Sequence, residues 1–206
     1  MPPRIDHTVT RGTFSLDGET FDVDNNVWVL GDDAECVVID APHDVEAIVG
    51  LVGGRTVKAI LCTHAHDDHV RAAPALREAV HAPILLHPDD RPLWELTHRD
   101  ELWDVDLSDG QEVEVAGTMI RVVHTPGHAP GAVCFVVDDL GCVFTGDTLF
   151  EGGPGATGRS YSDRGVLERS IVERLLPLGD HVVVHTGHGA DTTLGAERAH
   201  VTPGEA

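Results

Sequence analysis

The sequence predicts an α/β fold in which two mixed β-sheets pack face to face and helices cover the outside. Short runs rich in valine and isoleucine alternate with helical patterns along the chain. The β-rich runs fall into two halves, each followed by helical segments, and two half-buried sheets bury their apolar faces best against one another. With 206 residues, 41% of them hydrophobic, the chain suits a single domain spanning residues 1–206.

The individual elements follow from the local patterns. Strands are predicted in the first half at residues 27–30 and 36–39, which form a hairpin, and at 57–62 and 84–86. Helices are predicted there at residues 44–52, 70–80 and 89–97. The second half is expected to form strands at residues 113–115, 119–123, 134–137, 142–144 and 182–184, and a helix at 166–176. The glycine-rich segment 152–158 is short, which indicates a loop within the domain.

The charge of the chain excludes several classes of partner. The formal net charge is -21 and no basic stripe offsets it, so nucleic acid and anionic membrane surfaces are not expected to bind. No apolar run approaches the roughly 20 residues that span a bilayer, and the first residues lack an apolar signal-peptide core. The four cysteines lie in or beside apolar stretches without a CxxC pair, as expected of buried thiols in the cytoplasm.

The strongest functional signal follows the predicted strand at 57–62. The segment Thr63-His64-Ala65-His66-Asp67-Asp68-His69 places three histidines and two aspartates within six residues. Side chains alternate along an extended chain, so His64 and His66 point the same way. Asp68 and His69 fall at the turn into the next helix and can reach a second point nearby. Imidazole and carboxylate groups are suitable ligands for zinc or iron, so this segment predicts a metal site.

Three further candidate ligands follow predicted strands downstream. They are His128 in Thr125-Pro126-Gly127-His128, Asp147 in Thr145-Gly146-Asp147-Thr148, and His188 in Thr186-Gly187-His188-Gly189. A glycine stands immediately before each of them, which lets the backbone approach a crowded site. Each motif alone is weak evidence. Four strand ends that each offer a ligand are most simply explained if the four ends lie at one edge of the fold and share one metal site.

These motifs resemble the metallo-β-lactamase superfamily and, within it, the short glyoxalase II-like hydrolases. The HxHxDH motif corresponds to His64, His66, Asp68 and His69, and the resemblance extends over nearly the whole chain. It implies an αββα sandwich with the site along one edge of the two sheets. It also implies that His64, His66 and His128 hold one metal, that Asp68, His69 and His188 hold a second, and that Asp147 bridges them.

The resemblance further implies a reaction. Two divalent metals, zinc first with iron or manganese as alternatives, would share a bridging hydroxide and polarise a carbonyl, with Asp68 and Asp147 assigned to catalysis as well as to metal binding. The expected reaction is hydrolysis of a thioester of a low-molecular-weight thiol, as in hydroxyacylglutathione hydrolases. The small-molecule substrate is the only partner predicted, and the sequence gives no oligomeric state. Arg159, for a carboxylate, and Tyr161, for stacking or a hydrogen bond, are the predicted substrate-binding residues.

One departure from the family concerns the thiol carrier. Only 18 residues follow His188, so the helical domain that binds glutathione in long glyoxalase II proteins is not expected, and its basic residues cannot be carried over. One lysine against 13 arginines is typical of a GC-rich genome, and an actinobacterial source would make mycothiol a candidate carrier.

Four other functions are alternatives to the thioester hydrolase. A persulfide dioxygenase of the same superfamily keeps the whole HxHxDH motif but uses one iron, so the ligands alone do not separate it from the hydrolase. A true β-lactamase is disfavoured because that branch usually lacks the aspartate bridge, and an RNA-processing nuclease is disfavoured by the small size and acidic charge. A full ligand set also argues against a catalytically idle metal-binding protein.

The remaining histidines are expected to lie outside the site. Surface or capping roles are predicted for His7, His43, His81, His87, His98, His181 and His200. His124 and His185 lie three or four residues before a candidate ligand, so they are candidates for supporting one.

Overall fold

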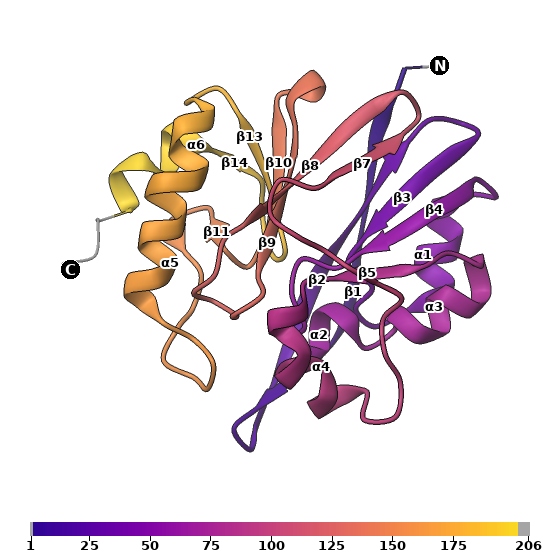
Figure 1. Cartoon of the computed structure of the whole chain (residues 1–206), viewed down its shortest axis with the longest axis horizontal. Coiled ribbons are helices and arrows are strands. Elements are labelled where there is room, and N and C mark those ends of the chain that lie inside the picture. The colour runs from indigo at the N-terminus through magenta and orange to yellow at the C-terminus, as the bar shows by residue number, and fades with distance from the viewer. Residues whose placement is uncertain (1, 202–206) are drawn as a thin grey trace.

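Two six-stranded sheets form the centre of the computed structural model, which describes residues 2–201 (Figure 1). The strands of the first sheet are, in spatial order, β1 (Arg4–Leu16), β2 (Glu19–Gly31), β3 (Glu35–Ile39), β4 (Thr56–Leu61), β5 (Ile84–Leu86) and β6 (Val105–Asp106). Those of the second are β14 (Thr192–Thr193), β13 (Val183–Thr186), β10 (Cys142–Gly146), β9 (Val133–Val137), β8 (Thr118–His124) and β7 (Glu112–Val115). A small two-stranded sheet joins β11 (Leu149–Phe150) to β12 (Gly153–Pro154).

Both large sheets are mixed, as predicted. In the first sheet β2 pairs antiparallel with β1 and β3, whereas β3, β4, β5 and β6 pair in parallel. In the second sheet β10 pairs in parallel with β13, and the other pairs are antiparallel.

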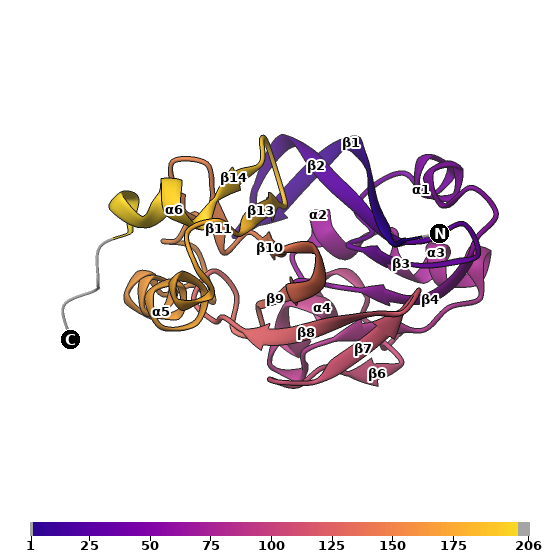
Figure 2. The ribbon, with the colours of Figure 1, turned by 90° about the horizontal axis from the view of Figure 1, so that it is seen from above.

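Helices cover the outer face of each sheet (Figures 1 and 2). The helices are α1 (Val45–Val52), α2 (Asp67–Val70), α3 (Ala73–Val80), α4 (Arg91–Thr97), α5 (Arg164–Ser170) and α6 (Leu194–Glu197). The first four lie against the first sheet, and α5 and α6 lie on the side of the second (Figure 1). No helix among residues 2–201 is long and apolar enough to cross a membrane.

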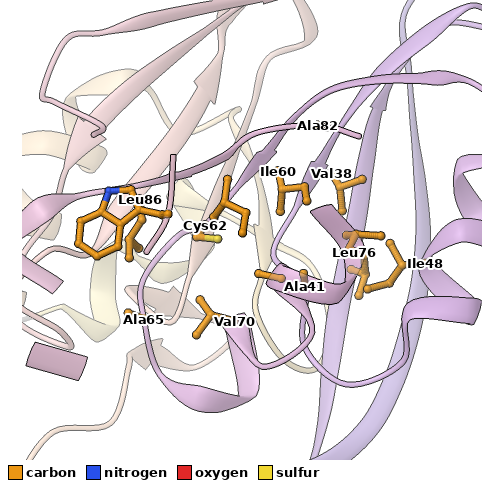
Figure 3. Packing of buried hydrophobic residues seen from close by; sticks show 14 of the residues in the cluster. Val38, Ala41, Ile48, Ile60, Cys62, Ala65, Val70, Leu76, Ala82 and Leu86 are labelled. Carbon is orange, nitrogen blue, oxygen red and sulfur yellow. The ribbon is translucent and has the colours of Figure 1, made fainter. Parts of the chain in front are cut away.

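Three buried clusters correspond to these layers and confirm the αββα arrangement. The middle cluster lies between the sheets and includes Leu30, Ile39, Leu61, Phe135 and Phe144. An outer cluster packs the other face of the first sheet against its helices, as Val38 and Ile60 do against Ile48 and Leu76 (Figure 3). The third packs the second sheet against α5 and includes Val136, Val184, Leu167 and Ile171. Burial of apolar side chains on both faces of both sheets is the main stabilising contribution.

Two helices differ from their predicted extents. The helix expected at 70–80 is divided into α2, which begins at Asp67, and α3, which begins at Ala73. Pro74 has no N–H to continue the hydrogen-bond ladder of α2, so the chain starts a new helix with proline in its first turn. The helix expected at 166–176 begins as α5 and continues as a π-helical turn over Ile171–Leu175.

The long hairpin of β1 and β2 is the main element that was not predicted. Each strand has 13 residues and their register runs from Arg4 opposite Gly31 to Leu16 opposite Glu19, whereas the sequence indicated only residues 27–30. Most side chains of β1 and of the first half of β2 are exposed or half-buried, so they lack the apolar alternation that marks a strand. The short strands β6, β11, β12 and β14 and helix α6 were not predicted either.

The strand directions bring the four ligand-bearing loops to one edge of the sandwich. Since β8 and β10 are both antiparallel to β9, and β13 is parallel to β10, the carboxyl ends of β8, β10 and β13 meet at the same edge. The loop after β4 reaches this edge from the first sheet, where Thr63 O accepts a hydrogen bond from Val133 N at 2.8 Å.

Candidate metal centre

Three imidazoles form a first subsite, defined here by His64, His66 and His128. His64 and His66 lie in the loop between β4 and α2, and the extended backbone of His66 immediately precedes that helix. The Nε2 atoms of His64 and His128 lie 3.0 and 2.9 Å from Nδ1 of His66. A tetrahedral metal with bonds of about 2.05 Å holds its ligand atoms about 3.3 Å apart. The three nitrogens therefore converge at close to the spacing that one metal ion requires.

A second subsite consists of Asp68, His69 and His188. The Nε2 atoms of His69 and His188 lie 3.2 Å apart, and His188 Nε2 lies 3.3 Å from Asp68 Oδ2. Asp68 and His69 come from α2 in the first layer, whereas His188 follows β13 of the second sheet. This subsite therefore joins the two halves of the molecule.

Asp147 lies between the two subsites. Its Oδ1 is 3.2 Å from His69 Nε2, and its Oδ2 is 3.5 Å from the Nε2 atoms of both His128 and His188. The loop after β13 approaches so closely that a Cβ on Gly187 would lie 2.3 Å from Asp147 Oδ1, which explains the glycine there. Asp147 Oδ1 is buried and, among the described residues, has no hydrogen-bond partner. A buried carboxylate oxygen with an unused acceptor fits a metal ligand.

Outward hydrogen bonds fix the orientation of four of the five histidines. Their Nδ1 atoms pair with protein oxygens: Thr63 Oγ1 for His64 at 3.0 Å, Asp40 Oδ2 for His69 at 2.8 Å, Ala156 O for His128 at 2.8 Å and Asp24 O for His188 at 2.7 Å. Such bonds make the outer nitrogen of each ring the hydrogen-bonding side and turn the inner Nε2 toward the other candidate ligands.

Asp40 supports the site and was missed by the sequence analysis. Besides pairing with His69, its carboxylate accepts hydrogen bonds from Thr63 N at 2.7 Å and Thr63 Oγ1 at 2.8 Å. It is buried and follows β3 directly. The rule that identified the other residues, a polar side chain at the end of a buried strand, would have identified Asp40 as well.

Asn25 and His43 form a second supporting group that was not predicted. Asn25 Nδ2 donates to Asp68 Oδ2 at 3.0 Å, and His43 Nε2 pairs with Asn25 Oδ1 at 2.8 Å. His43 was expected at the surface or in a cap. Asn25 lies in β2, outside the part of that strand that the sequence indicated, so no local signal pointed to it.

The two candidates for supporting histidines lie elsewhere. His124 Nε2 pairs with Pro130 O at 2.9 Å and its ring stacks on His87, whereas His185 Nδ1 pairs with Asp191 at 2.9 Å. Their proximity in sequence to a ligand was misleading, because β8 ends at His124 and β13 ends at Thr186, so the chain has left each strand before it reaches His128 or His188.

Burial and charge give the two subsites opposite protonation. Burial lowers the pKa of all three first-subsite histidines, that of His66 to about 3. Burial acts in the same direction in the second subsite, but the carboxylates outweigh it. Asp147 and Asp68 raise the pKa of His69 well above its usual range and that of His188 to about 10. Burial alone would raise the pKa of Asp68, but His69 beside it brings that pKa down to about 2.

A cavity of about 270 Å³ opens onto both subsites. Its wall includes Phe14 and Phe21 from the β1–β2 hairpin and Arg159 from the loop before α5. The Arg159 guanidinium lies 4.6 Å from the centre of the Phe21 ring and 2.8 Å from Glu19 Oε2. Tyr161 is 47% exposed and is not among the residues that line this cavity, and its contact with substrate stays a prediction.

Comparison with known proteins decides the family. The model of the metallo-beta-lactamase superfamily matches residues 20–190, a segment that contains both subsites and Asp147. The chain belongs to this superfamily. Hydroxyacylglutathione hydrolase GloC of Haemophilus influenzae is 31% identical over 187 residues, covering 84% of this chain and 87% of that protein. An uncharacterized protein of Mycobacterium leprae is 40% identical over 196 residues, covering 84% and 90%.

Solved structures of the superfamily share the fold. BLEG-1, described as a B3 metallo-beta-lactamase, superimposes with a TM-score of 0.79 at 30% identity, over 93% of this chain and 98% of its own. TTHA1623 in a di-iron-bound form gives 0.75 at 36% identity, over 88% and 95%. ETHE1 from Myxococcus xanthus gives 0.75 at 26% identity, over 96% and 86%. Together with the His/Asp groups, these relatives indicate a metal-dependent enzyme that uses divalent ions.

Proposed function

We propose that this metallo-β-lactamase-fold protein is a binuclear metallo-hydrolase that cleaves thioesters of a low-molecular-weight thiol. The observation that carries the proposal is the pair of three-residue subsites joined by Asp147 beside one cavity. The likeness to GloC, a hydroxyacylglutathione hydrolase, supports the thioester class. The four cysteines are buried and free, which fits a reducing cytoplasm.

The donor set fits two divalent ions. The first subsite offers three neutral nitrogens, and the second offers two nitrogens and a carboxylate, with Asp147 within reach of both. Nitrogen and oxygen donors suit zinc first and also iron or manganese. When bound, the metals supply an acidified water as nucleophile and Lewis-acid polarisation of the substrate carbonyl.

The protein's own residues hold and orient the reactants. Asp147 and Asp68 are ionised at neutral pH, so they bind cations without first losing a proton. Phe14 and Phe21 cover part of the cavity and exclude water from it, and Arg159 supplies a cation for a carboxylate on the thiol carrier. Hydrolysis yields an acid and a thiol. Because a thiolate is a fairly good leaving group, the cavity needs no strong general acid.

Persulfide dioxygenase activity with a single iron is the second candidate. The fold of ETHE1 covers 96% of this chain, and the ligand residues do not distinguish the two reactions. BLEG-1 adds β-lactam hydrolysis to the functions that an assay must separate.

Metal analysis combined with a substrate panel tests the proposal. The panel contains 2-hydroxyacyl thioesters of glutathione and mycothiol, glutathione persulfide with oxygen, and a cephalosporin. We expect two metals per chain and thiol release without oxygen uptake, with an Asp147→Asn variant as the background control. One iron per chain with oxygen uptake would favour the dioxygenase. Turnover of the cephalosporin alone would overturn the thioesterase proposal.

A further inference from the structure

A buried aspartate behind the first subsite has no role in the proposed chemistry. Asp90 is 0% exposed, and its two carboxylate oxygens accept hydrogen bonds from different loops. Oδ2 accepts from Ala65 N at 2.8 Å, and Oδ1 accepts from Gly131 N at 2.5 Å. Ala65 lies between His64 and His66, and Gly131 lies three residues after His128. One carboxylate therefore joins the two loops that supply the first subsite.

Asp90 stands immediately before α4 but does not use its side chain to cap that helix. Asp90 is the N-cap residue of α4, where an aspartate usually accepts a hydrogen bond from its own helix. Its side chain makes no such bond and turns toward the two loops. Burial removes water from the carboxylate and thereby raises its pKa to about 7. The carboxylate therefore accepts from Ala65 N and Gly131 N and from no N–H of the helix that follows it.

The packing around Gly131 shows how closely the link is fitted. A Cβ on Gly131 would lie 2.7 Å from Asp90 N and 2.9 Å from Asp90 Cγ, so only glycine allows this approach. The same two loops also meet through the hydrogen bond from Val133 N to Thr63 O at 2.8 Å. Asp90 thus lies in a tight junction immediately outside the metal ligands.

We propose that Asp90 is a positioning residue for the first subsite, because it fixes the loop of His64 and His66 relative to the loop of His128. It is neither a candidate ligand nor part of the cavity lining, and it acts only through the spacing of the three imidazoles. Neither of its partners belongs to the second subsite, so we expect its influence to be largest on the first. The proposal concerns metal binding and holds whatever reaction the enzyme catalyses.

A double-variant cycle on the metal-free protein tests this assignment, with zinc affinity measured by competition against a chromophoric chelator. His188→Ala leaves the first subsite complete, and His128→Ala leaves the second complete. Asp90→Asn keeps the size of the side chain but turns an amide NH₂ toward one of the two backbone N–H groups. We expect it to weaken zinc binding at least about tenfold in the His188→Ala background and less than about twofold in the His128→Ala background. Equal weakening in both backgrounds, or none in the first, would overturn the proposal.

Two further variants keep the test decisive. Gly131→Ala disturbs the same junction from the opposite side and should reproduce the selective loss of affinity. Asp104→Asn is the matched control, because Asp104 Oδ2 also accepts a backbone hydrogen bond, from Ile84 N at 2.8 Å, but contacts neither ligand loop. Its zinc affinities should be unchanged. If Asp90→Asn and Gly131→Ala both unfold the metal-free protein in circular dichroism, Asp90 is a general structural residue and the proposal is wrong.

Discussion

The two subsites contain similar residues but hold their protons in opposite ways. Burial dominates in the first, so His64, His66 and His128 are neutral imidazoles. Asp147 and Asp68 dominate in the second, so His69 and His188 carry protons in the metal-free protein at neutral pH. The first subsite can therefore accept a metal without displacing a proton, whereas the second must release protons first. The charge of the neighbouring carboxylates, rather than the type of ligand, determines whether the histidines of a subsite are protonated.

Loss of the residue between the subsites should have the largest effect. In the proposed binuclear site, Asp147→Ala removes an oxygen ligand from both metals, and it leaves His69 and His188 without their main counter-charge. We expect turnover to fall by at least about a thousandfold, with fewer than two metals per chain by elemental analysis. Two metals at full occupancy in this variant would show that Asp147 is not the bridge.

Loss of a ligand that belongs to only one subsite should allow the metal content of the two subsites to be measured separately. His128→Ala should reduce the content toward one metal while the domain stays folded, since the three apolar clusters do not include this side chain. The ion that remains in His128→Ala should be held by the second subsite. In His188→Ala the remaining ion should instead be held by the first subsite. Metal content and far-ultraviolet circular dichroism check both points, and global unfolding of His128→Ala would count against this view.

The difference in protonation predicts a difference in pH dependence. The pKa of His188 is raised to about 10, so below pH 10 its ring is protonated and competes with the metal. Zinc affinity of the second subsite, measured in His128→Ala, should therefore rise with pH, by about tenfold per unit for each proton displaced. Affinity of the first subsite, measured in His188→Ala, should change little between pH 7 and 8.5, because the pKa of His66 is about 3. If zinc affinity changed with pH equally in the two variants, the proposed difference in protonation between the subsites would be wrong.

The smallest expected effect lies outside the metal ligands, in the cavity wall. Arg159→Ala should raise KM for a carboxylate-bearing thioester by about tenfold, roughly 1.4 kcal/mol, with a smaller change in kcat. Arg159 already pairs with Glu19, so the substrate must displace an internal carboxylate. Arg11→Ala is the matched control, because Arg11 also pairs with an acidic residue of β2, Asp24, but its side chain is 85% exposed and lies outside the cavity lining. An unchanged KM for Arg159→Ala would show that this residue serves only the ion pair.

The sequence predicted the layers and the cluster of candidate ligands because both depend on local signals. His64, His128, Asp147 and His188 each follow a buried strand, and parallel strands bring such positions together. The supporting residues come from contacts that the sequence does not display. Asn25 in β2 reaches Asp68, which is 43 residues away, and Asp90 reaches Ala65 and Gly131, which are 25 and 41 residues away, so only the tertiary fold brings these residues together.

Four candidate ligands lie in the loop after β4 and in α2, beside the first sheet, and the other three lie in loops of the second sheet. This division affects how long the folded protein survives. Ions bound by ligands from both halves act as non-covalent cross-links that must be lost before the two halves separate. At a free metal concentration one hundred times its Kd, a single ion adds about 2.7 kcal/mol to the free energy of unfolding. Metal supply therefore sets resistance to unfolding and proteolysis as well as activity, so a cell short of metal would lose the enzyme along with its turnover.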